Sequence, residues 1–485
     1  MLLGLDLGTT AVKAIVLDPQ RGIVASDSLP NRQASPHPGW SEQDAGAWLA
    51  NALALIPRVC ATGGIDPAAI TGVGVAGCVP CVLLLDADAG PLRPALLYND
   101  ARAHAEIDEL AVELDAGAVL RRTGAGITVQ SVGPKLRWLQ RHEPELWART
   151  VRVAGSYDWL AGALAGAAYS ERNWALESGL YDLGEAGYAP DLCAAAGVET
   201  RLFGPIRDPR EVIGGVRADV AAATGLRAGV PVVAGLADHV SSAFAAGLAR
   251  HGDLLVKLGG SVDVLACSDR PLLDARLYLD AHPSPGLWLP NGCMASGGSG
   301  VRWFQRELAG GAGLDVLDAE AAATPPGADG VVMLPYLLGE KTPVNDPRAT
   351  GAFTGLRLGH GRGHLFRALL ESFAYGVRHH LEVLAEHGVQ PTRARITNGG
   401  ASSLLWKQIV ADVTGLVLEP VVDHPGSALG AAFAAGVGTG AFAHWSDIAR
   451  FVTLGEPIEP RPETADVYAV RYRAYRELYG ALKGA

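Results

Sequence analysis

The sequence has few cysteines, no basic run and no long hydrophobic run. It contains no stretch of about 18 consecutive apolar residues, so we expect nothing in it to span a membrane. Its formal charge is −11, from 51 acidic against 40 basic residues, which makes nucleic acid and anionic membranes poor partners. The first residues, MLLGLDLGTT, lack a basic region and are interrupted by Asp6, so we do not expect a signal peptide. With only six cysteines, we expect reduced thiols in a cytoplasmic protein.

Apolar segments of strand length alternate with longer segments in which apolar residues recur every three or four positions. A chain of 485 residues, of which 49% are hydrophobic, is too long for one core, so two large domains are expected. The alternation predicts an α/β fold with a partly antiparallel sheet. We predict strands at residues 2–8, 11–18, 22–29, 70–77 and 81–86, and a helix at residues 45–60.

The sequence pattern at the beginning of the chain recurs in its second half. The segments LLGLDLGTTAVKAIVLD (residues 2–18) and DLLVKLGGSVDVLACSD (residues 253–269) both contain an apolar strand, a Leu-Gly turn with small residues, and a second apolar strand. A single such turn is an ordinary hairpin. Two copies, one at the start of each half, predict a duplicated domain. We place the boundary after residue 245, which gives domains at 1–245 and 246–485.

The first turn, Gly8-Thr9-Thr10, has the composition of an anion-binding loop. Small residues let backbone N–H groups converge on an anion, and the threonine hydroxyls add donors. Asp6 at the strand end would face that anion. A carboxylate and a phosphate are both negative, so this arrangement makes sense only if Mg²⁺ lies between them. Lys13 is a further candidate cation. Two plain alternatives carry equal weight here: Asp6 caps a turn, and Lys13 is a solvated strand residue.

Four segments, in order, resemble the FGGY family of carbohydrate kinases and come nearest to its xylulokinase-like branch. They are GLDLGTTAVKAIVLD (4–18), GWSEQDAGAWL (39–49), PYLLGEKTPVNDPRATGAFTGL (335–356) and ITNGGASSLLWKQIVADVTGLVLEPV (396–421). The resemblance extends from about residue 2 to about residue 445. It implies a duplicated actin-like, ribonuclease H-like α/β fold, with ATP and a sugar meeting in the cleft between the domains.

Asp238 is the candidate catalytic base. The apolar segment VPVVAGL (230–236) predicts a strand that delivers Asp238 to its end, and HVSSAFAAGL (239–248) predicts a helix that follows. A carboxylate there can accept the proton of a sugar hydroxyl as that hydroxyl attacks the γ-phosphate. From the residues alone, an aspartate that caps the helix is the better interpretation. The resemblance implies the base, because the family's catalytic Asp ends a strand in this glycine-rich context.

The resemblance also implies nucleotide contacts in both halves. The first turn and the matching turn at 259–261 would hold phosphates, while MASGGSGVRWF (294–304) and TNGGASS (397–403) would approach the nucleoside. The family commonly has Thr where this chain has Gly260, so a hydroxyl donor is lost there. The nucleotide-binding candidates are Thr9, Thr10, Lys13, Gly259, Gly260, Ser261, Gly300, Gly399, Gly400 and Ala401, and the Mg²⁺ candidate is Asp6.

The segment AGCVPC, residues 76–81, has the Cys-x-x-Cys spacing of a redox dithiol or of half a zinc site. A strand follows it where a redox motif has a helix, and the other four cysteines lie far apart in sequence. The resemblance implies a sugar-pocket loop, with Cys78, Val79 and Pro80 in the places where xylulokinases carry Gln, Met and His. We therefore expect two reduced thiols that act as small apolar side chains.

Two further residues are substrate candidates by resemblance. His239 follows the base where related kinases place a polar sugar contact. Asp100 would accept sugar hydroxyls, and an ion pair with Arg102 is an alternative of equal weight. The segment GEKTPVNDPRATGAF (339–353) matches the family strongly but receives no chemical role from the sequence, so a brace within the second domain and an oligomer contact both stay open.

We therefore expect a kinase that uses ATP and Mg²⁺ to phosphorylate a primary hydroxyl of a small ketose, foremost a pentulose such as D-xylulose. The expected partners are the sugar and ATP, and a homodimer stays open. The alternatives are a kinase for glycerol, erythritol or a deoxy-sugar, an actin-like ATPase that senses nucleotide and moves a partner, and a family member without turnover. The ATPase has no use for the GWSEQD and ADHV elements. The intact Asp6, Thr9, Thr10 and Asp238 argue against a member without turnover.

Overall fold

The computed structural model describes residues 1–483, which form two compact units. The first unit comprises Met1–Ala249, Leu279–Trp288 and Pro425–Phe451, and the rest of the described chain forms the second. The predicted boundary after residue 245 thus lies close to the first crossing. The two later segments, which the sequence analysis assigned to the second domain, instead pack with the first unit. A single boundary does not describe this chain, because two segments return to the first unit.

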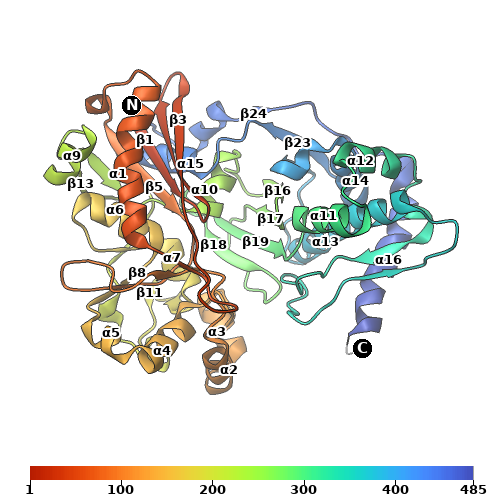
Figure 1. The fold of residues 1–485 in the computed structure, drawn as a ribbon, viewed down its shortest axis with the longest axis horizontal. Helices are drawn as coiled ribbons and strands as arrows, with labels where there is room; N and C mark the ends of the chain where they lie inside the picture. The colour runs from red at the N-terminus through yellow and green to blue at the C-terminus, as the bar shows by residue number, and fades with distance from the viewer. Residues whose placement is uncertain (484–485) are drawn as a thin grey trace. The chain divides into compact units, whose positions relative to one another are not determined.

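The first unit is built on a mixed sheet with the strand order β13-β14-β5-β1-β2-β3 (Figure 1). Strands β1 (Leu2–Leu7), β2 (Ala11–Asp18) and β3 (Gly22–Pro30) are successive antiparallel neighbours. Strand β5 (Gly72–Gly77) runs parallel to β1. The predicted strands at 2–8, 11–18, 22–29 and 70–77 and the partly antiparallel sheet are confirmed, while the segment predicted at 81–86 forms a shorter strand, Leu83–Leu85, outside this sheet.

The other elements of the first unit complete the sheet or cover it. They are β4 (Glu42–Gln43), α1 (Ala45–Thr62), β6 (Leu83–Leu85), β7 (Ala95–Leu96), α2 (His104–Glu113), α3 (Ala116–Thr123), α4 (Val132–His142), α5 (Pro144–Arg149), β8 (Arg152–Ala154), α6 (Ser156–Ala165), β9 (Ser170–Glu171), α7 (Arg172–Glu177), β10 (Tyr181–Asp182), β11 (Gly187–Tyr188), α8 (Pro190–Ala195), β12 (Ile206–Arg207), β13 (Val212–Gly215), α9 (Ala218–Thr224), β14 (Pro231–Val233), β15 (Leu236–Ala237), α10 (Asp238–Ala245) and α15 (Ser427–Gly438). The first returning segment begins at Leu279, the second residue of strand β18 (Tyr278–Ala281).

Helices α15 and α6 pack on opposite faces of this sheet. Gly4 and Gly74 are partners in register on β1 and β5, and a Cβ on either would overlap a carbonyl oxygen of α15. Gly77 lies three residues beyond Gly74 and so faces the other way, where a Cβ would contact α6. Glycine at these positions lets both helices approach the strands closely, and α15 thereby brings residues 425–451 into the first unit.

Helix α1 matches the predicted helix, but it also corrects an expectation. By length and composition alone, α1 is apolar enough to cross a membrane. The sequence did not indicate this, because Asn51 and Arg58 interrupt its apolar residues. In the structure α1 lies against β2 and β3 (Figure 1). Trp48, Leu55 and Val59 of this helix are fully buried. This is the environment of a core helix.

The second unit repeats the strand arrangement of the first. The strands of its sheet that lie wholly or mostly within this unit follow the order β19-β17-β16-β22-β23-β24. Strand β16 (Leu254–Leu258) pairs antiparallel with β17 (Val262–Ala266) and parallel with β22 (Arg393–Thr397), as β1 pairs with β2 and β5. The duplication predicted from the two Leu-Gly turns is therefore confirmed.

A long helix, α13 (Arg362–Glu386), organises the core of the second unit. It packs against α12 (Leu314–Ala322), α14 (Leu404–Thr414) and β20 (Val332–Leu334), and it buries Phe366 and Phe373. The other elements of this unit are β19 (Trp288–Met294), α11 (Gly298–Trp303), a π-helix (Phe304–Leu308), β21 (Ala352–Thr354), β23 (Val417–Val422), β24 (Thr453–Leu454) and α16 (Ala465–Leu482).

Candidate active site

Three predicted site residues lie at the carboxyl ends of neighbouring parallel strands in the first unit. Asp6 on β1 is in register with Ala76 on β5, and Ala76 is in register with Leu236 on β15. Cys78 follows β5 directly, and Asp238 follows β15. Parallel strands bring their carboxyl ends to one edge of a sheet, so the fold gathers Asp6, Cys78 and Asp238 there.

The strand that leads to Asp238 is interrupted, which the sequence analysis did not predict. The segment expected as one strand forms β14 and β15, separated by Ala234 and Gly235. Gly235 has a φ of 83°, and a Cβ there would overlap the carbonyl oxygen of Val75 on β5. The break therefore depends on glycine, which allows both the left-handed backbone and the close contact with β5.

Asp238 is the first residue of α10, and the helix N-cap is Ala237, which makes no side-chain cap. One carboxylate oxygen, Oδ1, accepts a hydrogen bond from the backbone N–H of His239 at 2.6 Å. Asp238 therefore does not occupy the N-cap position, which was the alternative to a catalytic base.

The Gly8-Thr9-Thr10 turn is held from outside by two polar side chains. Gln43 donates from Nε2 to the carbonyl oxygen of Thr9 at 2.6 Å, and Asn31 donates from Nδ2 to that of Gly8 at 3.0 Å. The backbone N–H of Asn31 also binds the carbonyl of Thr10 at 2.8 Å. Three successive carbonyls of the turn are thus bound by residues outside it. Gln43 belongs to the GWSEQD segment, so that segment fixes the turn.

Lys13 lies directly opposite Asp6 in the antiparallel β1–β2 pair. Residues paired in this way point to the same face of a sheet. Asp6 is buried at 7% exposure, while Lys13 is exposed. The predicted carboxylate and cation thus share one face at this end of β1.

The contacts of Asp100 are those of an ion pair with Arg102, the alternative to a sugar contact. Its Oδ2 accepts from the Ser41 N–H at 2.6 Å and from Arg102 Nη2 at 2.7 Å, while Oδ1 accepts from Arg102 Nε at 2.8 Å. The carboxylate is fully buried, and although burial opposes ionisation, these donors lower its pKa below the ordinary value. Arg102 also pairs with Glu42 and stacks on Trp40. The ion pair explains Asp100, and a sugar contact remains only a prediction.

The Cys78 and Cys81 thiols are in hydrogen-bond contact, and both are free cysteines that form no disulfide in the structure. Their sulfur atoms are 3.4 Å apart and both residues are buried. The carbonyl of Cys78 accepts from Ser156 Oγ at 2.6 Å, which fixes the loop on α6. The thiol of Cys81, burial and the charge of Asp238 raise the pKa of Cys78 well above its usual value. Val79 and Pro80 are also buried, so the whole loop is packed against the first unit.

Two residues beside this loop received no role from the sequence. Burial and the charge of Asp238 raise the pKa of Tyr98 to about 12, while the Thr9 hydroxyl acts against this rise. Lys135 on α4 is 1% exposed and donates from Nζ to the carbonyls of Leu97 at 3.1 Å and Tyr98 at 3.2 Å. Burial lowers the pKa of Lys135 to about 8. This buried lysine fixes the backbone that presents Tyr98 near Asp238.

His239 lies in a cluster of carboxyl groups. Its Nε2 is 2.8 Å from Asp280 Oδ2 and 4.0 Å from Glu177 Oε1, and its Nδ1 is 3.6 Å from Asp238 Oδ1. Burial opposes protonation, but Asp280, Asp238 and Glu177 together raise the pKa of His239 well above its usual value. Among residues 1–483, the group of His, Cys, Asp and Glu side chains close enough to share one metal ion is Glu177, His239 and Asp280.

In the second unit three loops converge at the matching sheet edge. The Gly298 N–H binds the Gly259 carbonyl at 2.8 Å, and the Ser299 N–H binds that of Gly260 at 3.0 Å. A Cβ on Gly259 would lie 3.2 Å from Asn398 Nδ2. The 259–261 turn, the start of α11 and the 398–401 loop are thus neighbours.

The predicted glycines of this second site differ in their surroundings. A Cβ on Gly300 would lie 3.0 Å from the Phe373 ring, and one on Gly400 would overlap Trp406 and Leu258. Packing inside the unit therefore explains both glycines. Gly399 has open space around it, while Ala401 packs against the hydrophobic core. Ser261 lies 3.4 Å from a carboxylate oxygen of Asp263.

The segment at 339–353 braces the end of β19 and the residue that follows it. Glu340 Oε1 accepts from the backbone N–H of Ala295 at 2.7 Å, and Thr342 Oγ1 accepts from that of Cys293 at 2.7 Å. Glu340 is 4% exposed, and burial raises its pKa to about 7. Of the two roles left open by the sequence, these contacts support a brace within the second domain.

Residues 1–245 match the N-terminal domain model of the FGGY family of carbohydrate kinases, and residues 254–439 match its C-terminal domain model. The chain belongs to the FGGY family of carbohydrate kinases. It is 30% identical to the xylulose kinase of Escherichia coli K12 over 485 residues, covering 99% of each chain.

Two further similarities extend over nearly the whole of this carbohydrate kinase. The L-xylulose/3-keto-L-gulonate kinase of E. coli K12 is 30% identical, over 99% of this chain and 97% of that protein. The crystal structure of xylulose kinase from Rhodospirillum rubrum has a TM-score of 0.95 and 44% sequence identity, and 99% of each chain is covered. The duplicated actin-like, ribonuclease H-like fold expected from the sequence is thereby confirmed.

The sequence analysis missed Glu177, Asp280, Lys135 and Ser156 of this kinase. Asp280 stands in LYLDAH, an ordinary alternating strand pattern beyond the predicted domain boundary, so nothing in the sequence relates it to His239. Lys135 and Ser156 are single polar residues in helical patterns. Their partners are backbone carbonyls of distant loops, which no local pattern reveals.

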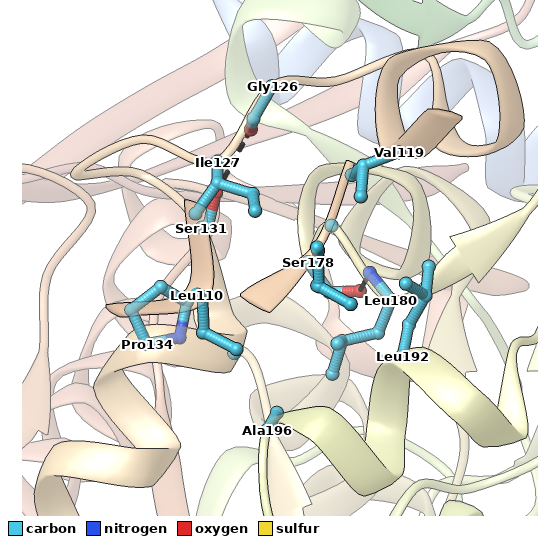
Figure 2. Close-up of a pocket in the computed structure, with 13 residues that line it drawn as sticks. Leu110, Val119, Gly126, Ile127, Ser131, Pro134, Ser178, Leu180, Leu192 and Ala196 are labelled. Carbon is cyan, nitrogen blue, oxygen red and sulfur yellow. Dashed lines mark hydrogen bonds between the residues drawn. The ribbon is translucent and has the colours of Figure 1, made fainter. Parts of the chain in front are cut away.

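The first unit also contains an apolar pocket away from these residues (Figure 2). Its lining comes from α2, α3, α4, α8 and the residues that follow α7, and none of the predicted site residues takes part. The polar contacts drawn there, from Ser131 Oγ to the Gly126 carbonyl and from the Leu180 N–H to Ser178 Oγ, fix the pocket's own loops (Figure 2). It is not part of the candidate active site.

Proposed function

We propose that this FGGY kinase transfers the γ-phosphoryl group of ATP to a primary hydroxyl of a pentulose such as D-xylulose. The observation that carries the proposal is the position of Asp238, which follows a strand at the same edge of the sheet as Asp6 and the Gly8-Thr9-Thr10 turn. The similarity to proteins named xylulose kinase supports the choice of sugar class.

Each element of the candidate site has a role in this reaction. Asp238 accepts the proton of the attacking hydroxyl. The backbone N–H groups and hydroxyls of Thr9 and Thr10, and the turn at 259–261, bind phosphate oxygens, and Lys13 adds positive charge. Phosphoryl transfer spreads negative charge over the equatorial oxygens, so such donors act on the transition state.

Asp6 is the proposed ligand of Mg²⁺. Mg²⁺ keeps several waters and binds one or two carboxylates together with substrate phosphates, so a single buried carboxylate beside a phosphate turn fits it. When bound, the ion would neutralise charge on the phosphates. No other described residue is needed to hold it in this proposal.

The two units divide the work in this proposal. The first, close to the predicted domain at 1–245, binds the sugar and carries the base. The second, within the predicted domain at 246–485, binds the nucleotide through the converging loops at 259–261, 297–299 and 398–401. The six free cysteines fit a reducing compartment, and we propose that the enzyme acts in the cytoplasm.

A second candidate is a kinase for a less polar sugar or a polyol. The loop formed by Cys78, Val79 and Pro80 is buried and offers weak donors or none. A site built around a substrate hydroxyl discriminates far more sharply than one that accommodates bulk. Efficient use of a deoxy-sugar, erythritol or glycerol in place of D-xylulose would favour this candidate.

The test is an ADP-release assay with ATP and Mg²⁺ over D-xylulose, L-xylulose, D-ribulose, erythritol and glycerol. We expect one pentulose to raise ADP release many-fold over the rate without sugar, with kcat/KM in the range of about 10⁴–10⁸ M⁻¹s⁻¹ that proficient enzymes reach. ATP hydrolysis that no sugar accelerates would contradict the proposal and favour the nucleotide-sensing ATPase.

A further inference from the structure

The imidazole ring of His239 separates the proposed base from a buried carboxylate. One ring nitrogen, Nδ1, faces Asp238 at 3.6 Å, and the other, Nε2, contacts Asp280 at 2.8 Å. Asp280 is 2% exposed, so it lies behind the histidine and away from solvent. His239 and Asp238 are consecutive residues at the start of α10, which fixes their backbones together. The three side chains form a row: Asp238, His239, Asp280.

Asp280 is held in place by a helix of the same unit. Asn173 on α7 is fully buried and exchanges two hydrogen bonds with the backbone of Ala281, at 2.7 and 3.0 Å. Ala281 also packs against Ala175 and Leu176 of that helix. Glu177 lies one helical turn beyond Asn173, so it projects from the same side of α7. This anchoring explains how a carboxylate 41 residues away in sequence reaches His239.

We propose that His239, fixed through Nε2 by Asp280, is a positioning residue that holds the Asp238 carboxylate in its productive orientation. The proposal rests on the role of Asp238 in the proposed kinase reaction, and it changes the role predicted for His239. A histidine whose Nε2 binds Asp280 has one nitrogen already used, and the ring edge that remains faces the base. A direct sugar contact, the role expected from the sequence, would not require His239 to bind Asp280 or to face Asp238.

The charges around the ring agree with this geometry. The titratable groups that face His239 are Asp238, Asp280 and Glu177, and against the effect of burial they raise the pKa of the ring well above its usual value. Burial and the charge of Asp280 raise the pKa of Glu177 well above its usual value, which favours the protonated form of this carboxyl. An imidazolium next to Asp238 favours the ionised carboxylate, the form that can accept a proton.

A metal ion held by Glu177, His239 and Asp280 is the rival interpretation of the same cluster. It needs three deprotonated ligands, so replacing any one of them removes the ion and its effect. The positioning role needs the charge of Asp280 and the proton of Glu177. The two interpretations therefore differ in how Asp280→Asn compares with Glu177→Gln, because glutamine resembles a protonated glutamate.

The experiment uses the full chain and a sugar that the wild-type enzyme has been shown to phosphorylate. The variants are Asp280→Asn, His239→Gln and Glu177→Gln, with Asp191→Asn as a matched control that removes an exposed carboxylate of the same unit. Each is measured for kcat, for KM of the sugar, for the pH dependence of kcat/KM, for thermal stability and for bound metal by elemental analysis. A wild type without sugar-dependent turnover would refute the kinase proposal itself and would be recognised before any variant is compared.

We expect Asp280→Asn and His239→Gln to lower kcat by about 10–100-fold, the effect of a misplaced catalytic group, with much smaller changes in KM. The acid limb of the kcat/KM profile should move to higher pH in both, because Asp238 loses the neighbouring positive charge or its support. The loss of kcat in Glu177→Gln should be at least about tenfold smaller than the loss of kcat in Asp280→Asn.

Three results would overturn the proposal. A rise in KM with unchanged kcat in His239→Gln would return His239 to the role of a sugar contact. Equal losses in Asp280→Asn and Glu177→Gln, together with one bound metal per chain in the wild type, would identify a metal site. Loss of stability in Asp280→Asn with an unchanged pH profile would mean that the contact is only structural.

Discussion

The side-chain amide nitrogen of Gln43 lies 2.6 Å from the carbonyl oxygen of Thr9, and this contact joins two motifs of the family. Gln43 belongs to GWSEQD, part of one of the four segments that carry the family resemblance, while Thr9 belongs to the proposed phosphate turn. The side chain of Gln43 is also the acceptor for Trp48 Nε1 at 2.9 Å, so it is fixed from both ends. The GWSEQD segment thus holds the turn through the carbonyl oxygen of Thr9.

Gln43→Glu should impair the kinase through this contact. Glutamate keeps the acceptor for Trp48 but has no donor for Thr9 and sets a negative charge against a carbonyl. We expect a loss of about 1–3 kcal/mol in the free energy of unfolding. We also expect a fall of at least about tenfold in kcat/KM for ATP, because the turn loses its geometry. Gln33→Glu, at an exposed glutamine that binds Ser41, is the control, and equal effects of the two substitutions would refute the role of Gln43.

Glu340 should make the stability of the protein depend on pH. Its pKa is raised by burial from an ordinary value of 4.5 to about 7, so the folded state holds a proton more tightly than the unfolded state. The stability it contributes is fully present below about pH 4.5 and is lost as the pH rises through about 7. The difference amounts to at most about 3 kcal/mol.

Glu340→Gln should abolish that part of the pH dependence, since the amide oxygen still accepts from Ala295 and Lys341. Urea unfolding at pH 5 and pH 8 measures it: the variant should gain stability relative to the wild type at pH 8 but not at pH 5. Glu456→Gln, at an exposed glutamate of the same unit, serves as the control. A variant that loses stability equally at both pH values would show that the carboxyl is ionised throughout.

The cysteines should be six free thiols, and the purified protein should contain no stoichiometric zinc. Because its pKa is raised, Cys78 should react with alkylating reagents far more slowly in the folded than in the unfolded protein. Mass spectrometry after alkylation in each state measures this. Cys78→Ser combined with Cys81→Ser should still turn over ATP with sugar. One zinc per chain, or a Cys78–Cys81 disulfide in the active enzyme, would contradict the account.

The sequence predicted the parts of the fold that depend on local pattern. Alternating apolar residues and tight turns gave β1, β2 and β3, and the repeated Leu-Gly turn gave the duplication. It did not predict that residues 279–288 return to the first unit, because Asn173 binds them through backbone contacts that any sequence could provide. The break at Gly235 was equally hidden, since a glycine in a strand pattern is compatible with a continuous strand.

The candidate site, like the fold, has residues that local sequence motifs predict and residues that only the folded chain brings together. Asp6, Asp238 and the Gly8-Thr9-Thr10 turn follow from motifs that are continuous in sequence. Asp100 was left between a sugar contact and an ion pair, because only the structure shows that Ser41 and Arg102 use both carboxylate oxygens. The carboxyl groups around His239 come from three separate segments, so their meeting is a property of the folded chain.

The central claim is that Asp238 is the base of a sugar kinase, and the turnover of Asp238→Asn tests it most directly. The measurement is sugar-dependent ADP release by this variant and by the wild type, with the same sugar, together with thermal stability and ATP binding as controls for folding. The account predicts a loss in kcat of at least about 10²–10⁴-fold, with stability and ATP binding nearly unchanged. Turnover close to that of the wild type would contradict it.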